Sequence, residues 1–103
     1  MNNLVDSCKE TLADLCLKYK VTRLELFGSA ALAGADAHKA GDLDFLVEFA
    51  PSSPEEHAER YFCLKEDLEA LFKIPVDLVE SRAMKNPYFI RRVNESRKLI
   101  YAA

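Results

Sequence analysis

Two aspartates separated by one residue are the most chemically suggestive feature of the sequence. Asp42 and Asp44 stand at the head of an apolar stretch that runs to Phe49. In an extended strand, alternate side chains share a face with their Cα atoms roughly 6.6 Å apart, so the two carboxylates repel each other. A hard divalent cation such as Mg²⁺, which takes oxygen ligands, offsets that repulsion. The pair therefore predicts a metal site that also holds substrate phosphates.

A third aspartate and a glycine–serine pair extend this set. Asp77 lies in a later apolar stretch, residues 75–79, and joins the metal site if the two stretches form neighbouring strands. Three carboxylates around two metal ions about 3.5–4 Å apart form the clamp used for in-line phosphoryl transfer. Gly28 lets the backbone approach a phosphate closely, and the Ser29 hydroxyl and the N–H groups that follow can donate to its oxygens.

Hydrophobic periodicity predicts the helices and strands that must position these residues. Apolar side chains recur every three or four residues in the helical segments and alternate in the strands. The expected helices cover 3–19, about 54–72 and a segment from about residue 88; the expected strands cover 21–27, 42–49 and 76–80. This order gives a small mixed sheet of at least three strands flanked by helices, an α/β (α+β) fold in a single domain over residues 1–103.

The second and third helices carry more specific expectations. Ser53 should cap the second helix, with Pro54 in its first turn. Its expected core-facing side chains are Tyr61, Phe62, Leu64, Leu68, Leu71 and Phe72. After the third helix, residues 99–101 should dock the C-terminus. The basic residues near this end are interpreted as a solvated helix surface, with partner binding as the alternative: Arg91, Arg92, Arg97 and Lys98.

The charge balance, the length of the apolar runs and the cysteine content restrict the cellular compartment and the class of partner that we expect for this protein. The chain carries 14 basic and 17 acidic side chains, whereas tight binding to a nucleic-acid backbone usually needs a basic face. No apolar run approaches the roughly 20 residues needed to cross a bilayer, and the N-terminus lacks the pattern of a secretory signal. The three cysteines form no C-x-x-C pair, and Cys8 and Cys16 are expected to be buried small hydrophobes. We therefore expect a cytoplasmic protein that binds neither membrane nor, directly, nucleic acid.

Taken in order, these motifs resemble those of the minimal nucleotidyltransferases in the DNA polymerase β superfamily. That family has a strand ending in L-F-G-S, a short helical turn, a strand beginning D-x-D, and a third Asp on a later strand. Residues 26–29, 42–49 and 76–79 occupy those places in this chain. A lone D-x-D is a weak signal, but the ordered set of three motifs is specific and spans nearly the whole chain.

The resemblance implies an Mg²⁺-dependent transfer of a nucleotidyl group, with ATP as the substrate and two Mg²⁺ ions as cofactors. Asp42, Asp44 and Asp77 would be the catalytic metal ligands, and Asp77 would also accept the proton of the attacking hydroxyl. Gly28 and Ser29 would cradle the β- and γ-phosphates.

The family's known associations also imply a partner. Minimal nucleotidyltransferases typically pair with a small helical HEPN-domain protein, often a toxin ribonuclease, and can move AMP onto one of its tyrosines. The resemblance therefore implies an antitoxin in a hetero-oligomeric toxin–antitoxin pair. The formal net charge of −3 suits a basic, RNA-cutting partner and would speed encounter with it.

One departure from the family pattern leaves a second interpretation open. Family members commonly carry a basic residue directly after the Gly-Ser, whereas this chain has Ala30 and Ala31. A cation beside the triphosphate stabilises charge that such reactions develop, and Lys39 or His38 in the same loop could substitute. The alternative is a binding module that keeps the fold, has weak or no catalytic activity, and neutralises its partner by complex formation.

Overall fold

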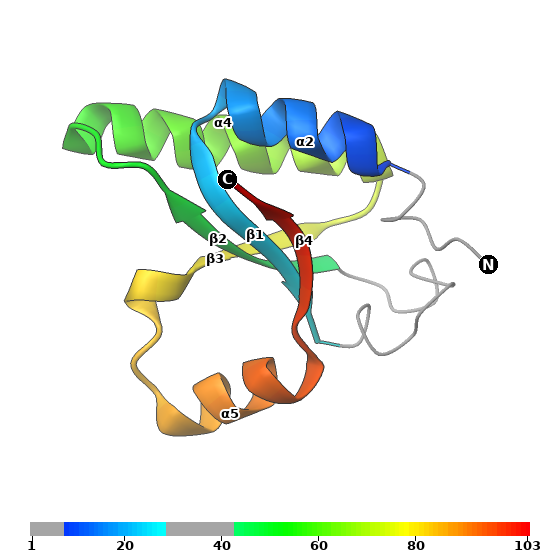
Figure 1. The fold of residues 1–103 in the computed structure, drawn as a ribbon, viewed down its shortest axis with the longest axis vertical. Helices are drawn as coiled ribbons and strands as arrows, with labels where there is room; N and C mark the ends of the chain where they lie inside the picture. The colour runs from blue at the N-terminus through cyan, green and yellow to red at the C-terminus, as the bar shows by residue number, and fades with distance from the viewer. Residues whose placement is uncertain (1–7, 29–42) are drawn as a thin grey trace.

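The computed structural model of the chain describes residues 8–28 and 43–103 (Figure 1). Its sheet has four strands in the spatial order β3-β2-β1-β4. The strands are β1 (Val21–Phe27), β2 (Leu43–Phe49), β3 (Val76–Glu80) and β4 (Lys98–Ala102). The helices are α2 (Lys9–Lys18), α4 (Pro54–Phe72), the 3-10 turn η2 (Ser81–Ala83) and α5 (Pro87–Ser96). None of the helices in this part of the chain is long and apolar enough to cross a membrane.

The predicted fold class, a small mixed sheet flanked by helices, is confirmed. β1, α4 and β3 begin and end at the residues that the sequence pattern predicts. The first part of the predicted N-terminal helix, residues 3–7, lies outside the described residues, and so does the predicted first residue of the second strand, Asp42. The C-terminal residues do more than dock: they form β4, a fourth strand antiparallel to β1.

α4 connects two strands that run in the same direction. β1 pairs antiparallel with β2, whereas β2 pairs parallel with β3. A parallel pair needs a crossover of a dozen or more residues, and α4 provides it. As predicted, Ser53 caps this helix: its Oγ accepts a hydrogen bond from the Glu56 N–H at 3.2 Å, and Pro54 occupies the first turn. Lys73, the residue that follows Phe72, caps the end of the helix with a left-handed φ of 60°.

The two faces of the sheet are covered differently. α2 and α4 lie side by side over one face, and α5 covers part of the other (Figure 1). Alternation along β2 sends Phe45 and Val47 into the larger core beneath α2 and α4. Leu46 points the opposite way and packs with Phe27 and Val93 beneath α5. The sheet thus has a larger apolar core on the face covered by α2 and α4, and a smaller one, with polar residues beside it, on the face covered by α5.

The prediction that Phe62 faces the core is wrong. Its side chain is 62% exposed, whereas the other predicted core positions of α4 are buried or half-buried. Successive residues of a helix point about 100° apart, so Tyr61 and Phe62 cannot both face the sheet. Tyr61 takes the inward position, and its hydroxyl donates a hydrogen bond to the Leu78 carbonyl on β3.

The cysteines contribute to packing. Cys16 is fully buried in the core, as predicted, and its burial raises the pKa of the thiol to about 12. A thiol with so high a pKa stays protonated and unreactive at neutral pH. Cys8 is only half-buried, so its prediction holds in part, and no disulfide joins the three cysteines, all of which lie in the described part of the chain.

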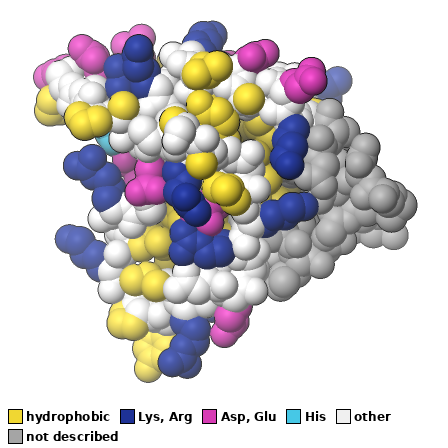
Figure 2. All heavy atoms as spheres, viewed as in Figure 1, with side chains coloured by type: hydrophobic (Ala, Val, Ile, Leu, Met, Phe, Trp, Pro, Cys, Tyr) yellow, Lys and Arg dark blue, Asp and Glu magenta, His cyan; other side chains and the backbone are white. Residues whose placement is uncertain are grey.

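A buried ion pair fixes the end of α5 against β1. Glu25 is only 3% exposed and projects from β1 toward the α5 side of the sheet. Arg97, the residue that follows α5, donates from Nε at 2.7 Å and from Nη2 at 2.6 Å to the two oxygens of this carboxylate. Arg23 adds a third hydrogen bond at 2.9 Å. Figure 2 shows basic and acidic side chains gathered on this side of the molecule, between the sheet and α5.

The ion pair also sets the charge state of Glu25. Hydrogen bonding from Arg97 is the largest cause of a pKa that falls from 4.5 to about 2, with Arg23 contributing in the same direction against the effect of burial. Paired donors in this fork geometry are among the stronger hydrogen bonds in proteins. Arg97 is therefore exposed, as the sequence suggested, but it lies just after α5 and is engaged by the buried carboxylate of Glu25.

Glu25→Gln should lower the free energy of unfolding by roughly 1–3 kcal/mol at neutral pH, because it removes charge-assisted hydrogen bonds to a buried group. Since folding lowers the pKa of Glu25 from 4.5 to about 2, its contribution is complete above pH 4.5 and is lost as the pH falls toward 2. Urea unfolding of both proteins across this range checks the prediction. The difference between them should shrink in acid; a difference that stays constant would contradict it.

Candidate active site

Three of the five predicted site residues meet in one pocket. Gly28, Asp44 and Asp77 line a cavity of about 460 Å³, within the size range of small-ligand sites. Ser29 and Asp42 lie outside the described residues, as do the loop residues 38 and 39 that could supply a basic group. The remaining described residues that line the cavity come from the end of β1 and from α5: Phe27, Phe89, Arg92, Val93, Glu95 and Ser96.

Parallel pairing of β2 and β3 places two aspartates beside each other. Asp44 and Asp77 are register partners, so their side chains project from the same face of the sheet on strands that lie about 4.8 Å apart. This is the arrangement on which the sequence prediction depended. Asp44 is half-buried and Asp77 is exposed. Like charges at directly paired positions destabilise a sheet unless an opposite charge lies near them.

The donor set at these positions fits a hard divalent cation. Two carboxylates on a shared face, open to a cavity, leave coordination positions for water and phosphate oxygens, as Mg²⁺ prefers. Within residues 8–28 and 43–103, no group of three or more His, Cys, Asp or Glu side chains is arranged to hold a metal ion. The third predicted ligand, Asp42, belongs to the part of the chain that is not described.

Negative charge extends along β3 beyond the pocket. Burial is the largest cause of a raised pKa for Tyr61, and the charges of Asp77 and Glu80 raise it further. Glu80 itself contacts His57 of α4, with 2.5 Å between its Oε1 and the His57 Nε2. Glu80 is therefore engaged on the far side of β3, and it does not line the pocket that Asp77 faces.

The position of the Asp44 carboxylate requires a residue without a Cβ at position 28. The residue ends β1 with a left-handed φ of +76°, a conformation that side chains with a Cβ rarely adopt. A Cβ at this position would lie 2.5 Å from the Asp44 Oδ2. The Gly28 N–H donates to the Ser96 Oγ at 2.8 Å. In this structure, then, the glycine gives the site space for the Asp44 carboxylate, and its own N–H already has an acceptor on α5.

α5 forms the wall of the pocket opposite the aspartates. Asn86 caps the helix, accepting a hydrogen bond from the Tyr88 N–H at 2.9 Å. Phe89 packs edge-to-face on Phe27 with 5.8 Å between ring centroids, and Val93, one turn later, is fully buried. The stripe of Phe89, Val93 and Ser96 therefore faces the sheet.

α5 contributes pocket residues that the sequence pattern does not assign to a site. Arg92 and Glu95 flank the inward stripe of this helix and line the pocket, although both are exposed. The spacing of the apolar residues on α5 was the available signal, because positions next to a buried stripe lie at the rim of whatever the stripe covers. It could not show that the covered surface was the one carrying Asp44 and Asp77.

Comparison with known proteins finds a family model that matches most of the chain. A family model described as a nucleotidyltransferase domain matches residues 8–100. A protein of Methanocaldococcus jannaschii named "putative protein adenylyltransferase" is 36% identical over 84 residues, which cover 82% of this chain and 79% of that relative.

Solved structures share the fold. One described as a "putative minimal nucleotidyltransferase" is 29% identical and superposes with a TM-score of 0.67 over 93% of this chain and 94% of that one. A complex from Shewanella oneidensis, in which a tri-AMPylated HEPN toxin is bound to an MNT antitoxin, superposes with a TM-score of 0.65. That alignment covers 96% of this chain and 73% of the other, and its 19% identity shows a common fold alone.

Gly28→Ala should impair binding of ATP and Mg²⁺ more than it impairs stability. The left-handed conformation costs alanine roughly 1–2 kcal/mol, but the new Cβ also displaces the Asp44 carboxylate, whose Oδ2 would lie 2.5 Å away. We expect a modest fall in Tm and a fall of about tenfold or more in affinity for ATP–Mg²⁺ by calorimetry.

Val47→Ala is the matched control for that experiment. Val47 is buried in the core on the opposite face of β2, so its truncation lowers stability without touching the pocket. It should bind ATP–Mg²⁺ like the unaltered protein at a temperature where both are folded. An equal loss of affinity in the two variants would show that Gly28 acts through stability alone.

Proposed function

The chain belongs to the nucleotidyltransferase domain family, and we propose that it transfers AMP from ATP to a hydroxyl group of a partner protein. The observation that carries this proposal is the pairing of Asp44 with Asp77 on one face of the sheet, inside a pocket that Gly28 also lines. The M. jannaschii relative is named as an enzyme that adenylylates protein, which supports a protein acceptor. We expect the reaction to take place in the cytoplasm.

We further propose that Asp42, Asp44 and Asp77 hold two Mg²⁺ ions when the nucleotide binds. When bound, the cations would neutralise the phosphate charge and orient the triphosphate, as metal ions usually do in phosphoryl transfer. The pocket supports this assignment because its two described carboxylates share a face, with Asp44 half-buried and Asp77 exposed. In this proposal Gly28 and Ser29 cradle the β- and γ-phosphates: Gly28, whose N–H already donates to the Ser96 Oγ, permits close approach of the backbone, and Ser29 donates its hydroxyl.

The reaction proceeds by in-line displacement. The acceptor oxygen forms a bond to the α-phosphorus, the bond from that phosphorus to the bridging oxygen breaks, and pyrophosphate leaves with the electron pair. Asp77 accepts the proton of the acceptor hydroxyl. It suits this role because it is exposed at the pocket, where an incoming side chain can reach it.

The acceptor in this proposal is a tyrosine of a HEPN-type toxin, and the chain is its antitoxin. The Shewanella oneidensis complex with the same fold contains an AMPylated HEPN toxin. The chain's net charge of −3 is compatible with a basic partner. A protein acceptor also suits a pocket that lies on the thinly covered face of the sheet, where α5 is the only described α-helix.

The test is to co-express the chain with the protein encoded beside it and to weigh that neighbour by mass spectrometry. With the unaltered chain the neighbour should carry one or more added AMP groups. Asp44→Asn and Asp77→Asn should each lower the modified fraction formed in a fixed time by about 100-fold or more, because each removes a carboxylate of the reacting site. The complex itself should persist in both variants.

Glu48→Gln is the matched control. Glu48 lies on the same strand and face as Asp44, is exposed, and does not line the pocket. It should modify the neighbour as the unaltered chain does. Full modification by Asp44→Asn or Asp77→Asn would overturn the assigned roles. A neighbour that binds the unaltered chain and is never modified would support the binding module instead.

A further inference from the structure

Arg92 is the only basic residue among the described residues that line the pocket. It faces a cavity that also holds three acidic side chains, Asp44, Asp77 and Glu95. Three of the other five arginines are paired with glutamates, Arg23 and Arg97 with Glu25 and Arg60 with Glu56, whereas Arg82 and Arg91 line other surfaces. The Arg92 side chain is exposed and makes no ion pair with any described residue.

A single hydroxyl links the Arg92 turn of α5 to the end of β1. The Ser96 Oγ accepts a hydrogen bond from the Gly28 N–H at 2.8 Å and donates one to the Arg92 carbonyl oxygen at 3.2 Å. The Arg92 turn is therefore held beside the Gly28 end of the pocket. In the proposed function, this is the end at which the β- and γ-phosphates bind.

A triphosphate needs positive charge at this end beyond what the metal ions provide. The leaving pyrophosphate gains negative charge as the bond to the α-phosphorus breaks, and fixed cations stabilise that charge. The positions directly after Gly28 and Ser29 are alanines. Arginine is well suited to the task because its planar guanidinium can donate two parallel hydrogen bonds to phosphate oxygens and stays charged at all relevant pH values.

We propose that Arg92 binds the β- and γ-phosphates of ATP and stabilises the departing pyrophosphate, supplying from α5 the cation that the loop after Gly28 lacks at its first positions. This inference rests on the proposed function, since it assumes that ATP occupies the pocket. The guanidinium takes no part in bond making and remains protonated throughout.

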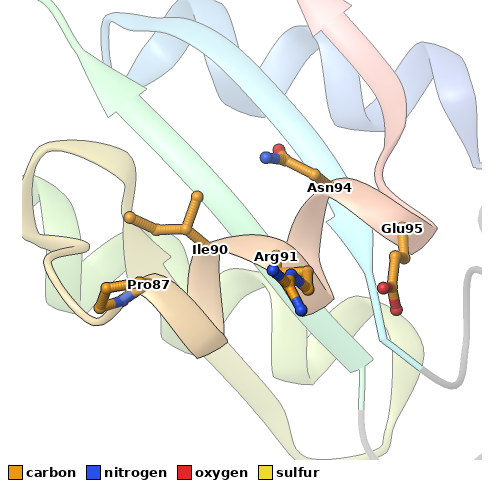
Figure 3. Close-up of a pocket in the computed structure, with 5 residues that line it drawn as sticks. All are labelled: Pro87, Ile90, Arg91, Asn94 and Glu95. Atoms are coloured by element: carbon orange, nitrogen blue, oxygen red, sulfur yellow. The ribbon is translucent and has the colours of Figure 1, made fainter.

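The neighbouring Arg91 provides a matched control. It lies about 100° further around the helix and lines a separate groove of about 510 Å³ on the outer side of α5, together with Pro87, Ile90, Asn94 and Glu95 (Figure 3). Arg91 and Arg92 thus have the same charge, are both exposed and are adjacent in the chain, but only Arg92 lines the pocket with the aspartates.

The experiment compares calorimetric titrations of ATP and of AMP, both with Mg²⁺, into the unaltered chain, Arg92→Ala, Arg92→Lys and Arg91→Ala. AMP lacks the phosphates that Arg92 is proposed to bind. Arg92→Ala should weaken ATP binding by about 10- to 100-fold, the usual range for a lost charged hydrogen bond, and leave AMP binding unchanged. Arg92→Lys should recover part of the loss, and Arg91→Ala should bind both nucleotides as the unaltered chain does.

The outcomes separate this inference from the proposed function. An unaltered chain that binds no ATP would overturn the proposed function and this inference with it. If the unaltered chain binds ATP and Arg92→Ala binds it equally well, the inference alone fails. Equal weakening of ATP binding and AMP binding in Arg92→Ala would also overturn the inference, because AMP has no β- or γ-phosphate. A loss of ATP affinity in Arg91→Ala as large as that in Arg92→Ala would overturn it too, because Arg91 does not line this pocket.

Discussion

The parallel pairing of β2 with β3 is the constraint on which the rest of the structure depends. It sets Asp44 beside Asp77, and it demands a long crossover, which α4 provides over the opposite face of the sheet. Because the crossover helix packs with α2 on that face, the larger apolar core forms there. The carboxylates are left on the other face, where they remain accessible to a metal ion and a substrate.

α5 turns this accessible face into a pocket. Three contacts hold it: Phe89 against Phe27, the Ser96 hydroxyl on the Gly28 N–H, and Arg97 on the buried Glu25. Each joins the helix to β1, whose end also approaches Asp44. The helix can therefore contribute side chains to the site at fixed positions, although it is only ten residues long. The contacts that stabilise this part of the protein therefore also fix the geometry of the site.

The sequence predicted the strand faces well because alternation is a local property. It placed Asp44 and Asp77 on two strands, but periodicity cannot choose between parallel and antiparallel neighbours, so their pairing was conditional until the topology was known. The sequence indicates only a solvated helix surface, or partner binding, for Arg92, because a helix-surface arginine looks the same in sequence whatever surface it overlooks. Phe62 was misplaced because apolar character alone does not show which of two adjacent aromatic residues faces inward. Ser29 and Asp42 remain predictions.

The central claim is that Asp44 and Asp77 form one divalent-cation site for a nucleotide. Paramagnetic broadening of backbone amide resonances by Mn²⁺, added with ATP in place of Mg²⁺, tests it most directly. If the two carboxylates form this site, the signals of Gly28, Asp44 and Asp77 should broaden first, while that of Cys16, buried beneath α2 on the other face, should persist. Broadening centred instead on the acidic first turn of α4, or no selective broadening at all, would contradict the claim.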